Sequence, residues 1–275
     1  MISVSNVRIL VISFSTARSP VISVSNIRSH GTSVTNTRNT IISFSTARIS
    51  VISVSTARSP VIPVSTSKSP VITVSTSRSS VIAVNVAKSL VLLVYAARRP
   101  VISVSNTVHV SPVTSVTNNR SPVISFSAAI SPVISVSTAI TPVISVSNTE
   151  HISPVTSVTN NRSPVISFSA VISPVISVST AITPVISASN TAHVSPVTSV
   201  TNNRSPVISF SAARSPVISA STSRIPVIMV YAVRSPVITV DIAINPVISV
   251  SAARSLVISF WLLRNIPSEI SFRGN

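Results

Sequence analysis

The chain has 275 residues, of which 45% are hydrophobic, 8% charged and 4% aromatic, with twenty prolines, two glycines and no cysteine. This composition excludes a typical disordered chain, which has low hydrophobicity and many charges, and lacks the varied side chains that specify an enzyme's core and site. Twenty Lys and Arg stand against three Asp and Glu, so the net charge of +17 favours contact with polyanions.

The first ten residues, MISVSNVRIL, already follow a repeat, with Met1 in the place of its first Val. They contain no basic segment before an apolar one and no cleavage motif of small residues, so they predict no secretory signal peptide. The absence of cysteine excludes disulfides and gives no indication of the redox compartment.

Residues 1–100 consist of ten-residue units, of which Val51–Pro60, VISVSTARSP, is representative. We number the positions of each unit from 1 (Val) to 10 (Pro). Position 2 is mostly Ile, position 4 is Val or Phe, and positions 3 and 5 are mostly Ser. Position 8 is always basic here: Arg8, Arg18, Arg28, Arg38, Arg48, Arg58, Lys68, Arg78, Lys88 and Arg98.

Residues 101–226 form three higher-order blocks of equal length, 101–142, 143–184 and 185–226, each with one twelve-residue unit followed by three units of ten. The first two blocks differ at only three positions. One site carries Val108, Glu150 and Ala192 in the three blocks, so it is under little chemical constraint, and recent tandem duplication explains the pattern. Ten-residue units resume over 227–260, and the tail 261–275 lies outside the repeat.

The VISVST segment of each unit predicts a β-strand, because apolar and polar residues alternate and β-branched residues dominate. In this interpretation positions 2, 4 and 6 point to one side and positions 1, 3 and 5 to the other. The ARSP segment is the predicted turn, and a proline in most units argues against a helix.

The predicted fold class is all-β or largely unstructured, with strand-turn repeats and no conventional globular core. If ordered, the strands form a solenoid-like or meander stack; otherwise they are weak strands that self-associate or aggregate. The scarcity of glycine counts against tightly wound turns.

The basic residues at position 8 are the candidate functional residues. Stacked strands lie about 4.8 Å apart, so a column of unpaired Arg repels itself and calls for a polyanionic partner, either nucleic acid or acidic polysaccharide. An alternative is that these cations interrupt aggregation-prone segments. The candidate polyanion contacts are Arg18, Arg28, Arg38, Arg48, Arg58, Lys68, Arg78, Lys88 and Arg98.

Other motifs give little indication of chemistry. His109, His151 and His193 recur once in each block, too far apart to share a metal. Asn119, Asn161 and Asn203 begin Asn-Arg-Ser sequons, each followed by a Pro that we expect to weaken glycosylation. Nothing resembles a nucleophile with its base, a phosphate loop or paired carboxylates, so we expect no enzymatic activity, cofactor or metal.

Three hypotheses follow. The first is a low-complexity tandem-repeat protein without catalytic activity, translated from a minisatellite-like array that stays in frame as it duplicates. The second is a structural or adhesive β-repeat protein that binds polyanions through its Arg columns. The third is a membrane-associated protein, which is weakened because Ser121–Asn148 is broken by prolines and Val81–Ala97 is short and contains Lys88, leaving no convincing transmembrane helix. The compartment is not indicated.

Overall fold

The computed structural model describes the chain except for residues 17, 108–111, 130–131, 150–153, 172–173, 190–195, 262–268 and 274–275. Every described element is a β-strand. The chain divides into two compact units, Met1–Ser135 and Val136–Asn275, which we call unit 1 and unit 2. The boundary falls within β8 (Val133–Ala139).

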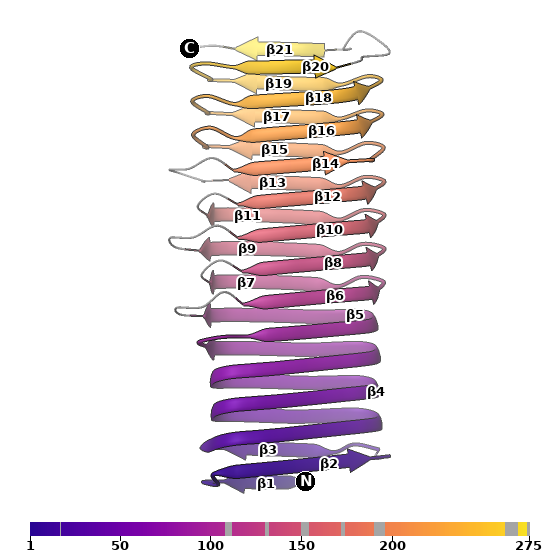
Figure 1. The fold of residues 1–275 in the computed structure, drawn as a ribbon, viewed down its shortest axis with the longest axis vertical. Coiled ribbons are helices and arrows are strands. Elements are labelled where there is room, and N and C mark those ends of the chain that lie inside the picture. Colours follow the sequence, from indigo (N-terminus) through magenta and orange to yellow (C-terminus); the bar gives the residue numbers. More distant parts are fainter. Residues whose placement is uncertain are drawn as a thin grey trace. The chain divides into compact units, whose positions relative to one another are not determined.

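Unit 1 contains the strands that precede β8 (Figure 1). They are β1 (Ile2–Ser5), β2 (Ile9–Ser15), β3 (Val21–Ser25), β4 (Ile27–Ala87), β5 (Val91–Thr107), β6 (Val113–Asn119) and β7 (Val123–Ala129). In β4 and β5 the pairing between successive coils continues through the corners, as from Ser75 with Tyr95 to Ser79 with Arg99, so these elements wind as a continuous ribbon (Figure 1).

Unit 2 contains the strands that follow β8, most of them short. They are β9 (Val143–Thr149), β10 (Val155–Asn161), β11 (Val165–Val171), β12 (Val175–Ala181), β13 (Val185–Ser189), β14 (Val197–Thr201), β15 (Val207–Ser211), β16 (Val217–Ser223), β17 (Val227–Tyr231), β18 (Val237–Ala243), β19 (Val247–Ser251), β20 (Val257–Trp261) and β21 (Glu269–Arg273).

Each unit is a parallel β-solenoid in which two repeats make one coil. In unit 1, Ile2 pairs with Ile22 and Val71 with Val91, so each strand segment lies beside the segment two repeats further along the chain. In unit 2, Val155 pairs with Val175 in the same way. Of the predicted alternatives, the all-β, solenoid-like stack is confirmed, rather than a meander or a largely unstructured chain. Consecutive ten-residue repeats lie in opposite sheets.

The twelve-residue repeats lengthen a coil without changing its register. Where a coil includes such a repeat, the paired residues are further apart in the sequence, as in Val91 with Val113 and Val175 with Val197. Equivalent positions still pair, position 1 with position 1.

The core is a column of apolar side chains between the two sheets. Positions 2 and 4 are buried along the stack, as at Ile52, Val54, Ile62 and Val64. The predicted inward orientation of position 6 is wrong: Thr56 is exposed, whereas the residue at position 7 of the same repeat, an alanine, is buried. Position 10 is also buried, so the corner contributes two inward side chains.

A left-handed residue at position 6 causes this reversal. Thr56 has φ 53° and Asn36 has φ 52°, a conformation that turns the chain and shifts the inward side to position 7. Asn tolerates this region, but Thr and Ala are uncommon in it. The sequence argument that scarce glycine disfavours tight winding is therefore wrong, because non-glycine residues form these corners.

Proline fits at position 10 because the corner does not use its N–H group. Its carbonyl accepts a hydrogen bond from the backbone N–H of the Val that opens a strand one coil later, 2.9 Å from Pro112 O to Val133 N and from Pro206 O to Val227 N. Pro lacks the N–H donor that a strand interior would need, so it is tolerated at this corner, immediately before the strand.

Candidate functional site

The basic residues at position 8 lie in two columns, not one. Because one coil contains two repeats, successive cations alternate between the two edges of the solenoid, the corners where the chain passes from one sheet to the other. In unit 1 we call these edge I and edge II. The edge I cations are Arg8, Arg28, Arg48, Lys68 and Lys88, and the edge II cations are Arg18, Arg38, Arg58, Arg78 and Arg98.

Backbone hydrogen bonds hold each column in register. On edge I, Ser29 donates its N–H to the carbonyl of Arg8 at 3.0 Å, and Ser89 donates to Lys68 at 2.8 Å. On edge II, Asn39 donates to the carbonyl of Arg18 at 3.1 Å. Neighbouring cations of one edge are therefore one strand spacing apart at their backbones, about 4.8 Å.

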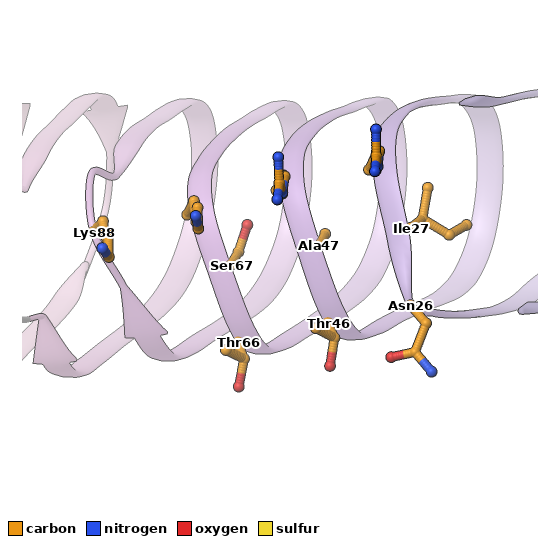
Figure 2. Close-up of a pocket in the computed structure, with 10 residues that line it drawn as sticks. Asn26, Ile27, Thr46, Ala47, Thr66, Ser67 and Lys88 are labelled. Carbon is orange, nitrogen blue, oxygen red and sulfur yellow. The ribbon is translucent and has the colours of Figure 1, made fainter. Parts of the chain in front are cut away.

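A shallow groove of about 460 Å³ runs along edge I. Positions 6, 7 and 8 of successive coils line it. Figure 2 shows Asn26, Thr46 and Thr66 directed away from the coils. The cations Arg28, Arg48, Lys68 and Lys88 complete the lining.

A matching groove of about 520 Å³ follows edge II. Here the outward residues at position 6 are Asn36, Thr56 and Thr76. The cations that line it are Arg38, Arg58, Arg78 and Arg98. Each edge thus combines a column of cations with a parallel column of hydroxyl and amide groups that can donate hydrogen bonds.

The positive charge of unit 1 has no acidic side chain to offset it. Twelve of the twenty Lys and Arg lie in residues 1–135, whereas the three acidic residues, Glu150, Asp241 and Glu269, all lie in unit 2. The nine candidate contacts are all exposed in the structure. Closely spaced like charges without a partner repel one another, and a bound polyanion relieves that repulsion.

Unit 2 has shorter columns. On one edge the backbone N–H of Arg204 bonds to the carbonyl of Ile182, so an apolar residue interrupts the cations Arg162 and Arg204. On the other edge Arg214, Arg234 and Arg254 follow one another, with the backbone N–H of Arg234 and Arg254 each bonded to the preceding Arg carbonyl. The longest uninterrupted columns of the described chain are therefore those of unit 1.

Aromatic side chains do not line either groove of unit 1. Of the Phe residues at position 4, Phe44, Phe126, Phe168 and Phe210 are buried in the core, whereas Phe14 is half-buried. The exposed aromatic side chains Tyr95, Tyr231 and Trp261 lie at position 5, on the sheet faces. The grooves consequently offer charge and hydrogen bonds but no stacking surface for bases.

The sequon asparagines are structural. Asn119, Asn161 and Asn203 occupy position 7 and are each 4% exposed. The Oδ1 atom of Asn203 accepts a hydrogen bond from the backbone N–H of Ala181 at 2.8 Å, and its Nδ2 donates to the carbonyl of Thr201 at 2.7 Å. These side-chain amides hydrogen-bond to the backbone at the corner, a structural role that the sequon pattern did not suggest.

The remaining sequence candidates contribute no site. His109, His151 and His193 lie outside the described residues. No group of three or more His, Asp and Glu side chains that could hold a metal occurs among the residues that the structure places. In that same part of the chain, no helix is long and apolar enough to cross a membrane.

Position 6 is the part of the site that sequence reasoning missed. Alternation placed it inside the strand, although its preference for Asn and Thr was a signal: Asn tolerates the left-handed conformation, and a polar residue suits an exposed corner. The small residues at position 7, often Ala, were the matching signal for an inward corner side chain.

Comparison with known proteins gives no relative: no protein-family model, curated protein or solved structure matches this chain.

Proposed function

We propose that this protein is a non-enzymatic structural solenoid that binds linear acidic polysaccharides along the edges of unit 1. The observation that carries the proposal is the pair of uninterrupted cationic columns, edge I and edge II, in a unit without an acidic side chain. Their regular spacing suits a partner with repeating negative charges, which can contact successive coils without bending.

The groups beside the cations favour a polysaccharide over a single-stranded nucleic acid. Proteins that bind single-stranded nucleic acid combine cations with aromatic side chains on which bases stack, and neither groove has such a side chain. Outward Asn and Thr side chains at position 6, such as Asn26 and Thr46, supply hydrogen bonds instead. Sugar hydroxyl, carboxylate and sulfate oxygens match these groups.

Affinity chromatography of the full chain on immobilised heparin tests the proposal. We expect retention that weakens steeply with salt, since each cation contact displaces counterions from the polyanion. Columns of poly(dT) and duplex DNA at equal charge density serve as contrasts, and the protein should elute from them at lower salt. Elution from either nucleic acid at the same or higher salt would contradict the polysaccharide assignment, and no salt-dependent retention at all would contradict polyanion binding.

A variant without the ten cations tests the two edges directly. Replacing the ten cations of edge I and edge II by Gln removes them from both columns, whereas Arg99, Arg120 and the cations of unit 2 remain. We expect this variant to elute from heparin close to the void volume at physiological salt.

The competing hypothesis is that the chain is the translation of a repeat array and has no function, and it stays a prediction. If it is right, mass spectrometry of native extracts should detect no peptide of the chain.

A further inference from the structure

We infer that unit 1 is bivalent, with edge I and edge II each holding a separate polysaccharide chain, so that the protein cross-links acidic polysaccharides. This inference rests on the proposed function and adds how the partner is arranged. It comes from the alternation of the cations: consecutive basic residues, such as Arg48 and Arg58, lie in different columns.

The two edges are separate binding surfaces. The groove of edge I and the groove of edge II share no lining residue. Between Arg48 and Arg58 the chain crosses from one edge to the other as a strand over 51–56. A strand of this length covers about 16 Å, roughly twice the Debye length of about 8 Å at physiological ionic strength. The fields of the two edges are thus largely independent in solution.

The surface between the edges is neutral. On one sheet the outward residues of a coil are Val51, Ser53 and Ser55, and on the other they are Val61, Pro63 and Ser65. A polyanion that lies along one column finds no charge on these faces to draw it across to the other column. Each column therefore binds its own chain, or a distant segment of the same chain.

With two binding edges, one protein molecule can link two polysaccharide chains. Once one edge is occupied, the other remains free to bind a second chain, and long polysaccharides with many sites then form a network. A short oligosaccharide molecule can bind only one edge at a time. Two such molecules fill both edges of a protein without linking it to another protein. Chain length therefore separates binding from cross-linking in an experiment.

The test uses the full chain in a background that removes the exposed Arg residues other than the ten cations of edge I and edge II named above. In this background Gln replaces Arg99, Arg120, Arg162, Arg204, Arg214, Arg224, Arg234 and Arg254. Arg120 is included because it follows Arg98 on edge II, as the hydrogen bond from the N–H of Ser121 to the carbonyl of Arg98 shows.

Three variants are built on this background. The edge I variant adds Gln at Arg8, Arg28, Arg48, Lys68 and Lys88, and the edge II variant adds Gln at Arg18, Arg38, Arg58, Arg78 and Arg98. A split variant with the same net charge adds Gln at Arg8, Arg48, Lys88, Arg38 and Arg78, and so leaves cations on both edges.

Two measurements are compared. Calorimetry with a short heparin oligosaccharide should give two sites per chain for the background and one site for either single-edge variant. Light scattering with long heparin should rise for the background and, at lower salt, for the split variant, but not for the single-edge variants. Circular dichroism checks that each variant retains its β-structure.

A measurement on the unmodified protein adds a check that needs no variant. Light scattering should pass through a maximum as long heparin is added, because excess heparin places different chains on every edge and dissolves the network. Scattering that persists in a large excess would indicate self-association of the protein and overturn the inference.

Failures of the two proposals are distinguishable. If the background protein binds no heparin oligosaccharide, the proposed function fails. If it binds but shows one site, polysaccharide binding stands and bivalency is overturned. The same holds if light scattering with long heparin rises as strongly for a single-edge variant as for the background.

Discussion

The imidazole of His30 stacks on the ring of Phe44, with centroids 4.0 Å apart and planes inclined by 27°. His30 occupies a buried position 10, where most coils have Pro, and neither of its ring nitrogens has a hydrogen-bond partner. Burial lowers the pKa of His30 to about 4, because a charged imidazole would lose its hydration there. The ring is therefore neutral in the folded protein at pH 7.

We predict that His30 makes the solenoid acid-sensitive. Above pH 6.5 the ring is neutral in both folded and unfolded chains, so it gives no pH dependence. As the pH falls from 6.5 towards about 4, the unfolded chain takes up a proton at His30 while the folded chain does not. The free energy of unfolding then falls by about 1.4 kcal/mol per pH unit.

The variant His30→Leu removes this pH dependence. Thermal melts at neutral pH and at a pH between the two pKa values should show a smaller loss of melting temperature for the variant than for the parent protein. Acidic side chains do not complicate unit 1, because residues 1–135 contain none. Equal losses in the two proteins would contradict the assignment.

The strained corners predict that Asn stabilises where Thr now stands. Thr56 and Thr76 have φ 53° and 52°, a region that costs an L-residue about 1–2 kcal/mol and that Asn tolerates better. We expect Thr56→Asn and Thr76→Asn each to raise the free energy of unfolding by about 0.5 kcal/mol. Denaturant titration measures the change, and Ser53→Asn, in the adjacent strand, is the control that should not stabilise.

The strands and the parallel stack were predictable because the repeat itself specifies them. Alternation of Ile and Val with Ser marks positions 2 and 4 as the inner face, and identical repeats stack most simply in register, as Ile2 with Ile22 shows. The exposure of the candidate cations was also predictable, since Arg and Lys rarely lie inside without a partner.

The corner geometry was not predictable from alternation alone. A single left-handed residue, such as Thr56, reverses which side chains point inward. The alternation of apolar and polar residues does not indicate where such a residue lies. The division of the cations into two columns follows from the coil length of two repeats, and this length depends on how both corners close. The sequence alone therefore predicted the charge of the site but not its division between two edges.

Buried hydroxyl groups without partners identify sites where an apolar residue should stabilise. Thr114 occupies position 2, is fully buried and pairs in register with Leu92, but its Oγ1 has no hydrogen-bond partner. Burying a hydroxyl in this way costs roughly 1–3 kcal/mol, and Val has nearly the same shape. We expect Thr114→Val to raise the free energy of unfolding by about 1 kcal/mol, measured by denaturant titration.

The matched control is Thr37→Val, in the same unit. The Oγ1 atoms of Thr37 and Thr40 form a buried hydrogen bond of 2.6 Å. Replacing Thr37 by Val therefore removes the hydrogen-bond partner of the Thr40 hydroxyl. This variant should lose about 1 kcal/mol. Stabilisation in both variants would mean that side-chain hydrophobicity, rather than hydrogen bonding, decides the outcome.

The corner amide of Asn203 should matter for stability and not for glycosylation. Asn203→Ala leaves the backbone N–H of Ala181 and the carbonyl of Thr201 without their side-chain partner, and an unsatisfied buried group costs about 1–3 kcal/mol. Ser205→Ala destroys the same Asn-Arg-Ser sequon but leaves the amide in place. In protein expressed through a secretory host, we expect the melting temperature to fall for Asn203→Ala alone, and intact-mass measurement to find no glycan on the parent. A glycan at Asn203 would show that the amide is available for modification, and equal destabilisation by Ser205→Ala would show that the loss of stability is not specific to the amide.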